Sequence, residues 1–410
     1  MPSQRLIPAT LLLSLLAMGR APAATFKIEI DYMVAAGHSH MPSQAVIDAV
    51  VQMFACRGHT LIIDVDDALP HYNVLRRNPN NCSGSLFSYN GEAASFGSLR
   101  DTYFDRINDP TWNYCIFAHQ YEDPNCNTTG SSGLGQTPGR YFVVTLGAFS
   151  GQTGTLFDQA ATLAHEFGHN LGLSHCGESN CDADGNYNPI LPSIMSYRYQ
   201  LAGVRTNVLC NNLAPPQAIF KDIDYSEGRQ CQQNELALNE FNGTFMLPVD
   251  WDCDGTLEAN VIQDIGGDGD GWCGDATGLS VLQDLDEWNT VALYTTLRDR
   301  GELPEPEEVA CITAEEWDLV QRELLGRGSC PQPALQTESC PSGRNVFVSP
   351  GTGSGVGWCT FTFKGVQTAQ TLSTPGSVYF LRPGDYNESG VTTLNKNGIW
   401  MCNTGTAVIR

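Results

Sequence analysis

The sequence lacks any apolar run long enough to cross a bilayer. The stretch from Leu6 to Met18 is shorter than the roughly 20 residues that a membrane-spanning helix needs, and no other stretch is long enough. Arg5 precedes this stretch and Ala21-Pro22-Ala23 follows it, which is typical of a secretory signal peptide with a small-residue cleavage site. Residues 1–23 are therefore expected to be a signal peptide, and the mature protein to be secreted with no membrane span.

Basic residues are also scarce. The chain has 22 Lys and Arg against 45 Asp and Glu, which gives a formal net charge of −23. This balance argues against nucleic acid or an anionic membrane as a partner, because both repel an acidic surface. The surplus carboxylates would suit calcium, but they would equally keep a secreted protein soluble.

Cysteine, by contrast, is abundant. The chain has 15 cysteines, none of them in the expected signal peptide. In an oxidising compartment this number predicts a set of disulfides with one thiol left over. The sequence cannot fix the connectivity, but three local pairings would each close a short loop: Cys115–Cys126, Cys176–Cys181 and Cys253–Cys273.

The 410 residues suit two or three domains. Hydrophobic periodicity predicts strands and helices that alternate before residue 172: strands at 25–33, 61–65, 113–121 and 140–149, and helices at 43–56, 97–107 and 156–171. This order predicts an α/β (α+β) domain with a twisted mixed sheet over residues 24–225. Composition then suggests three further parts: an Asp/Gly-rich segment at 226–300, a linker with cysteines at 301–344 and a small β module at 345–410.

The most informative motif is HEFGHNLGLSH at 165–175. His165 and His169 lie four residues apart on a predicted helix, so their imidazoles project from one face and can bind one metal ion. Gly172 can end the helix with a positive φ and return His175 as a third ligand. Three protein ligands leave a fourth position for water, and Glu166 can act as its general base and later as a general acid. The motif predicts one catalytic zinc ion.

This elongated motif resembles that of the metzincin zinc peptidases. Downstream, SIMSY at 193–197 resembles their Met-turn, in the version found in astacins and serralysins, and NYNPILPSIMSYRYQ at 186–200 resembles a group of exported bacterial metallopeptidases. The resemblance implies that Met195 forms an apolar floor under the zinc and is not a ligand. It also implies that Tyr197 approaches the zinc and stabilises the tetrahedral intermediate.

The same resemblance implies that an edge strand before the active-site helix pairs with an extended substrate. The predicted strand at 140–149 has the right place in the sequence, which points to Val143, Val144, Thr145 and Leu146. Cys176 and Cys181 have a spacing similar to that of a second zinc site in archaemetzincins, but the later Cys-x-x-Cys of that group is absent, so we expect a disulfide. The sequence leaves no room for a large propeptide between residue 23 and the first strand.

The other histidines carry weaker signals. His38 and His40 are close enough in sequence to capture a metal ion, but near an N-terminal strand they are expected to be polar loop residues. His59, His71 and His119 have no metal-ligand spacing to one another and are expected to be structural.

Two acidic clusters resemble parts of calcium loops, although neither is a full EF-hand. We expect them to bind structural calcium or to be solvated acidic loops; their carboxylates are Asp250, Asp252 and Asp254, and Asp264, Asp268 and Asp270. Near the C-terminus, residues 376–410 resemble a single coil of a right-handed β-helix, which Cys359–Cys402 could staple.

Together these features predict a secreted zinc endopeptidase that acts on proteins or peptides. Two alternatives stay open at this point. One is a secreted adhesion or binding protein with a vestigial zinc site, which the intact Glu166 disfavours. The other is a zinc amidase that acts on a non-protein amide by the same chemistry.

Overall fold

A computed structural model describes residues 23–176, 184–204, 223–228, 230, 232–242, 249, 251–252, 254, 256–266, 279–318 and 320, and the backbone of short strands beyond residue 344. Residues 1–22 of the expected signal peptide lie outside this range. No helix in the described ranges is long and apolar enough to cross a membrane. The fold is mixed α/β, as the sequence predicts, and is built around one mixed sheet.

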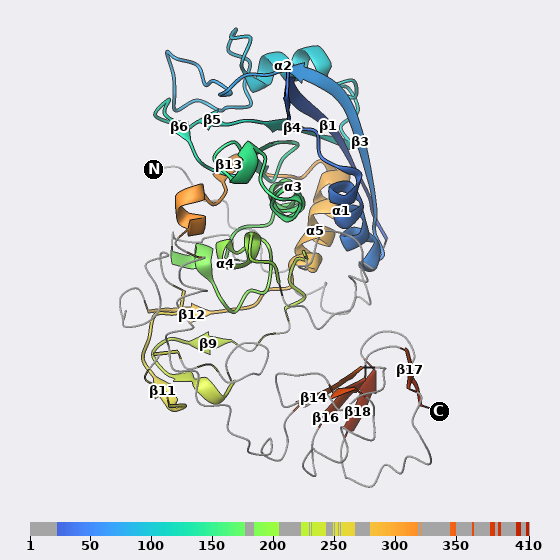
Figure 1. Ribbon diagram of the computed structural model, residues 1–410, viewed down its shortest axis with the longest axis vertical. Helices are drawn as coiled ribbons and strands as arrows, with labels where there is room; N and C mark the ends of the chain where they lie inside the picture. Colours follow the sequence, from blue (N-terminus) through green and yellow to red (C-terminus); the bar gives the residue numbers. More distant parts are fainter. Residues whose placement is uncertain are drawn as a thin grey trace.

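Four parallel strands form the middle of this sheet, and an antiparallel strand follows at one end (Figure 1). In spatial order they are β3 (Thr60–Pro70), β1 (Thr25–Ala35), β4 (Trp112–Ala118), β8 (Tyr141–Thr145) and the antiparallel β7 (Gly133–Thr137). A late segment, β13 (Glu307–Ala310), pairs antiparallel with β7. The short strand β2 (His38–Ser39) pairs antiparallel with the end of β1, whereas β5 (Tyr121–Glu122) and β6 (Thr128–Thr129) form a separate two-stranded sheet.

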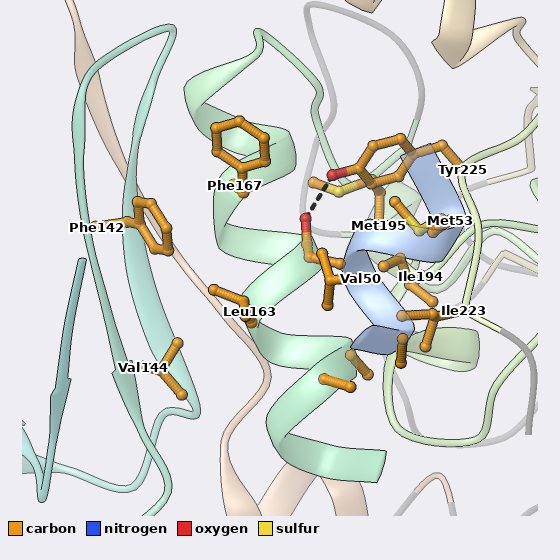
Figure 2. Close-up of a cluster of buried hydrophobic side chains, with 14 of the residues drawn as sticks. Val50, Met53, Phe142, Val144, Leu163, Phe167, Ile194, Met195, Ile223 and Tyr225 are labelled. Carbon is orange, nitrogen blue, oxygen red and sulfur yellow. Dashed lines mark hydrogen bonds between the residues drawn. The ribbon is translucent and has the colours of Figure 1, made fainter. Parts of the chain in front are cut away.

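Helices cover both faces of the sheet because its strands are apolar on both sides. Alternation along β8 places Phe142 and Val144 in one core with α1 (Gln44–Cys56) and α3 (Leu156–Asn170). Figure 2 shows these two side chains directed toward Leu163 and Phe167 of α3. The intervening Val143 faces a second core that includes α2 (Phe96–Tyr103).

Local sequence explains where α3 begins and ends. Thr155 and Asp158 form a reciprocal capping box at its first turn. At its other end Gly172 has a φ of 85°, which a residue with a side chain rarely adopts. The seven helices and strands predicted before residue 172 are all present, with ends that shift by a few residues.

The predicted boundary at residue 225 is wrong, and so is the linker assignment of 301–344 for its described part. Trp288, Val291 and Tyr294 of α5 (Glu287–Arg300) are buried in the same core as α1 and α3, and β13 belongs to the main sheet. Ile312 is also in this core. The sequence did not predict this packing, because these segments are mostly acidic and only a few apolar residues pack against the first domain.

Smaller elements make up the rest of the described chain. Around buried Trp251, a satellite core involves β9 (Gln233–Asn234), β10 (Leu238–Asn239), β11 (Ala259–Val261) and β12 (Val281–Leu282). Beyond residue 344 the strands pair in parallel; they are β14 (Asn345–Ser349), β15 (Phe363–Lys364), β16 (Val378–Leu381), β17 (Gly384–Tyr386), β18 (Ile399–Cys402) and β19 (Ala407–Ile409). Parallel stacking suits a β-helix, but β14, β16 and β18 stack in sequence, so the prediction of a single coil is wrong.

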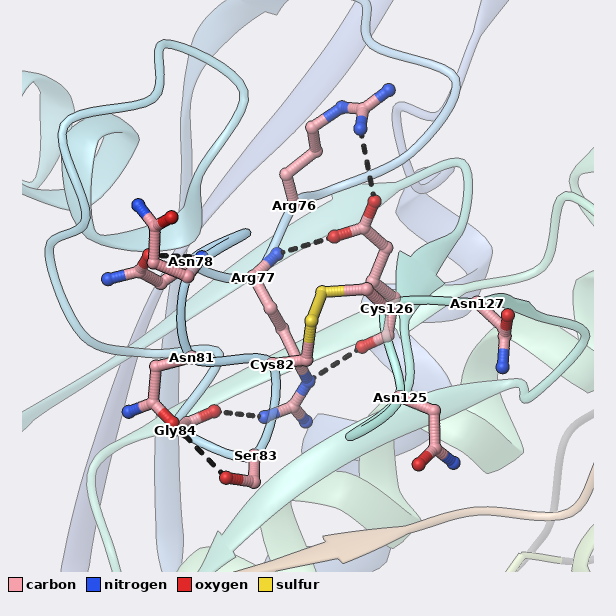
Figure 3. Close-up of a disulfide and its surroundings, with 12 residues drawn as sticks. Arg76, Arg77, Asn78, Asn81, Cys82, Ser83, Gly84, Asn125, Cys126 and Asn127 are labelled. Carbon is pink, nitrogen blue, oxygen red and sulfur yellow. Dashed lines mark hydrogen bonds and ion pairs between the residues drawn. A yellow bond between two sulfur atoms is a disulfide. The ribbon is translucent and has the colours of Figure 1, made fainter.

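One disulfide joins Cys82 to Cys126 (Figure 3). The predicted pair Cys115–Cys126 is therefore wrong: Cys115 lies within β4 and its thiol is fully buried in the core beneath α1 and α3. Cys176 is disulfide-bonded, as expected. Its expected partner Cys181 lies outside the described residues, as do the cysteines at 253, 273 and 359.

Candidate metal centre

Helix α3 and the turn after it bring three histidines to one point. The Nε2 atoms of His165 and His169 are 3.0 Å apart, and that of His175 is 3.0 Å from His169 and 3.1 Å from His165. The first two lie one helical turn apart, and the positive φ of Gly172 returns the chain to supply the third. The geometry thus gathers the three residues that the motif selected.

The second nitrogen of each ring contacts an oxygen that can only accept a hydrogen bond. The Nδ1 atoms of these histidines lie 2.7 Å from Ile194 O, 2.8 Å from Leu173 O and 3.1 Å from Asn186 Oδ1, respectively. Each Nδ1 must therefore carry the proton and donate it, which leaves three Nε2 lone pairs facing one another. A cation at their centre removes this repulsion. Four ligands at 2.0–2.1 Å in a tetrahedron would be about 3.3 Å apart, close to the observed spacing.

Burial keeps these rings neutral. It lowers the pKa of His165 and His175 well below the usual range, with smaller contributions from neighbouring histidines, and lowers that of His169 to about 4. Neutral imidazole is the form that binds a metal ion. The donor set therefore fits a zinc-class ion with three nitrogen ligands.

Glu166 lies between α3 and β7, beside this centre. A Cβ at Gly133 would lie 2.2 Å from its Oε1, and one at Gly135 would lie 2.9 Å from its Oε2, so both glycines are needed for β7 to pass this close. Both carboxylate oxygens are buried without a hydrogen bond of normal geometry in the described chain. Burial raises the pKa of Glu166 well above its usual range, and the Cys311 thiol opposes the shift. A buried carboxyl with such a raised pKa is a candidate for proton transfer.

Met195 lies beneath the helix that carries the histidines. Its Sδ would be 2.5 Å from a Cβ at Gly168, so the helix rests directly on the sulfur. In the same layer the Tyr225 hydroxyl donates to Ala164 O at 2.5 Å (Figure 2). The Met195 side chain is fully buried against this face of α3, and its role as an apolar floor under a metal ion stays a prediction.

Tyr197 begins α4 (Tyr197–Gln200), and its ring centroid lies 4.4 Å from that of His175. Its hydroxyl donates a 2.6 Å hydrogen bond to the carbonyl oxygen of Ala310, the last residue of β13. Burial, followed by the nearby Cys311, raises the pKa of Tyr197 well above its usual range, so the hydroxyl keeps its proton. Tyr197 can therefore donate to an oxygen beside the three histidines.

The predicted substrate-pairing edge is wrong. β8, with Val143, Val144 and Thr145, lies inside the sheet between β4 and β7, and these side chains and that of Leu146 are buried. The strand outside β8 is β7, which the sequence concealed because Gly133 and Gly135 weaken any strand pattern. β13 covers the outer side of β7. The edge of β8, where an extended substrate was expected, is thus occupied by β7, and the next edge is occupied by β13.

Cys311, the residue after β13, lies near the metal centre, which the sequence did not predict. Its Sγ atom and one ring nitrogen each of His165 and His169 all lie within 4.8 Å of one another. The residue is buried, and its backbone N–H donates to Gly133 O at 3.1 Å. No spacing in the sequence ties Cys311 to the motif, because it lies 136 positions after His175.

A cavity of about 760 Å³ opens beside the centre. Its lining joins the metal centre, the end of β7, α5 and β13, and includes His175, Tyr197, Thr137, Tyr294 and Val309. Such a cavity can hold side chains of a molecule bound at the centre.

The acidic segment is described only in part, and calcium stays a prediction there. Asp250, Asp268 and Asp270 lie outside the described residues. Asp252 groups with Glu240 and Glu258, whereas Asp254 accepts hydrogen bonds from Thr256 and Asp264 accepts one from the backbone of Gly266. The two loops that the sequence suggested therefore stay a prediction as well.

A scan against protein-family models finds no match for the chain, and a search of curated proteins finds no similar sequence.

Proposed function

We propose that the protein is a secreted zinc endopeptidase of the metzincin type. The observation that carries this proposal is the contact between β13 and the metal centre. Ala310 pairs with β7, and the Cys311 N–H donates to Gly133 O of the same strand. The main-chain carbonyl oxygen of Ala310 accepts a hydrogen bond from the Tyr197 hydroxyl, whose ring lies against His175. A peptide substrate would need this same pairing and this same hydrogen bond.

We assign each residue a step in the proposed hydrolysis from its position in the centre. A zinc ion bound by the three Nε2 atoms would supply a Lewis acid and lower the pKa of water in its open position to about 7. Glu166 is placed to take a proton from the attacking water, since its carboxylate is buried beside His165 and His169. The same carboxyl then delivers a proton to the leaving amine.

Tyr197 and the backbone of β7 position the substrate. The hydroxyl of Tyr197 donates to the oxygen of the bond under attack, where negative charge develops. The main chain of β7 holds the peptide extended, and the cavity beside His175 takes side chains. The side-chain selectivity of the reaction would then depend on this cavity.

The alternatives explain fewer of these contacts. An adhesion protein has no use for a buried carboxylate without hydrogen bonds next to metal ligands. A zinc amidase would use Glu166 and the histidines, but would not need a strand edge that pairs with an extended main chain. The pairing of β7 with β13 favours a polypeptide substrate.

The proposal is tested by incubating the mature protein with a diverse peptide library and sequencing the products. His169→Ala, which removes one metal ligand, is the matched control, and circular dichroism verifies its fold. We expect internal cleavage by the wild type and none by the variant. Absence of peptide cleavage by wild type loaded with zinc, together with hydrolysis of small non-peptide amides, would replace the proposal with an amidase.

A further inference from the structure

Seven of the eight histidines gather in two places. Three form the candidate zinc centre, and four form what we call the second histidine cluster: His38, His40, His71 and His119. One ring nitrogen from each of these four lies within 4.8 Å of the other three. From the sequence, His38 and His40 are expected to be polar loop residues near an N-terminal strand, and His71 and His119, which have no metal-ligand spacing, to be structural. The fold instead brings together four residues that lie up to 81 positions apart.

The sheet topology explains why the four meet. Strands β3, β1 and β4 are parallel neighbours, so their carboxyl ends lie at one edge of the sheet. His71 directly follows β3, and His119 directly follows β4. β1 continues past its last pairing with β4 and turns through Gly37, at a φ of 79°, into β2 and His38. The carboxyl edge of an open α/β sheet is a common place for ligands.

The ring nitrogens of this cluster have the spacing of metal ligands. His38 Nε2 is 2.9 Å from His40 Nε2, which in turn is 3.3 Å from His119 Nδ1. The ring centroid of His71 lies 5.0 to 5.4 Å from those of the other three. The corresponding centroids at the candidate zinc centre are 4.7 to 5.1 Å apart. The two clusters therefore have closely similar dimensions.

Burial and missing partners distinguish the cluster from a polar loop. His40 is only 4% exposed, and Nε2 of His71 is buried without a hydrogen-bond partner in the described part of the chain. Burial, then the neighbouring histidines, lowers the pKa of His40 to about 3, and burial also lowers those of His71 and His119. Burial thus favours the neutral form of His40, His71 and His119, which is the form that binds a metal ion.

The backbone around His119 is fitted closely to this arrangement. The N–H of Gly147 donates to His119 O at 2.8 Å, and a Cβ at Gly147 would lie 2.5 Å from that oxygen and 2.8 Å from Cδ2 of the ring. A glycine at this position therefore lets the loop after β8 close over the ring. The candidate zinc centre is near the other end of β8, where Asn170 donates to Tyr141 O.

We propose that His38, His40, His71 and His119 bind a second zinc ion, with a structural role. Imidazole nitrogen suits zinc, and four protein ligands leave no open position, which separates this site from the catalytic arrangement. The ion joins the ends of β1, β3 and β4 to the β1–β2 turn. This inference does not rest on the peptidase assignment, because it concerns different residues.

The test counts zinc in the full mature chain after removal of metal, reloading with Zn²⁺ and dialysis. We expect two zinc ions per chain in the wild type and one in His165→Ala/His169→Ala. We expect one in His71→Ala/His119→Ala, and none when all four substitutions are combined. His59→Ala is the matched control and keeps two, because His59 stacks on Trp288 outside both clusters.

Co²⁺ in place of Zn²⁺ should give a tetrahedral visible spectrum in His165→Ala/His169→Ala, and zinc should raise the melting temperature of that variant. If His71→Ala/His119→Ala fails to fold, His165→Ala/His169→Ala still tests the proposal, because it keeps all four proposed ligands. A folded His165→Ala/His169→Ala protein that retains no zinc would overturn the proposal. So would a folded His71→Ala/His119→Ala protein that still binds two.

Discussion

Single residues around the three histidines decide which chemistry the centre can perform. The acceptor oxygens at Nδ1 fix the tautomer, and Tyr197 directs a proton toward the place where a carbonyl oxygen lies. Motif spacing predicted His165, Glu166, His169 and His175, because ligands on one helix and its turn are local in sequence. Cys311 could not be predicted, since only the pairing of β13 with β7 brings it there.

Tyr197→Phe tests the most specific of these contacts. Loss of a donor to developing oxyanion charge should lower kcat by about 10²- to 10³-fold. KM and zinc content should change little, because the ring remains packed against His175. Tyr199→Phe is the control, as its hydroxyl donates to Pro189 O instead. Steady-state kinetics on a cleaved peptide measure the effect, and an unchanged kcat would remove Tyr197 from the mechanism.

Asp31 gives a residue-level prediction about pH. Burial raises its pKa to about 7, although Tyr114 and the backbone of Asp67 donate to its carboxylate. Between about pH 4 and pH 7 the folded protein therefore binds more protons than the unfolded chain, so stability falls as pH rises, by up to about 1.4 kcal/mol per pH unit. Asp31→Asn should remove this contribution to the pH dependence of stability. Urea unfolding at pH 5 and pH 7 measures the free energy of unfolding of both proteins. An equal change between the two pH values in wild type and variant would contradict the prediction.

At the scale of elements, strong periodicity predicted well and weak patterns did not. α1, α3 and the parallel strands are apolar and long, so their sequence patterns identified them. β7 contains two glycines that make room for Glu166, and α5 and β13 lie in acidic stretches. Their positions depend on tertiary contacts, which a local pattern does not record.

β13 gives the element-level prediction. Glu308 anchors this strand, because it accepts hydrogen bonds from buried Arg77 at 2.8 Å and from Leu86 N at 2.7 Å. Glu308→Ala should weaken the docking of β13 by about 2–5 kcal/mol. We expect faster amide exchange over residues 307–311 and faster peptide cleavage. Glu305→Ala is the control, because Glu305 is exposed and does not line the cavity. Unchanged exchange, or slower cleavage than in the control, would show that β13 does not cover the substrate position.

The whole molecule is held by long-range links as well as by its core. Cys82–Cys126 joins positions 44 residues apart, and Figure 3 shows Arg77 beside it. The guanidinium of Arg77 donates hydrogen bonds to the carbonyl oxygens of Glu122 and Gly84. Cys82→Ala/Cys126→Ala should therefore cost roughly 2–4 kcal/mol of unfolding free energy. Urea unfolding measures this, and an unchanged midpoint would show that the surrounding hydrogen bonds suffice.

The most direct test of the central claim compares wild type with Glu166→Gln at equal zinc content. The amide keeps the size of the side chain but cannot accept the proton of water. We predict equal zinc binding at the three-histidine centre and a loss of peptide cleavage of at least about 10²-fold, the lower range for general acid–base catalysis. Cleavage by Glu166→Gln at the wild-type rate would contradict the assignment of this centre as a zinc peptidase active site.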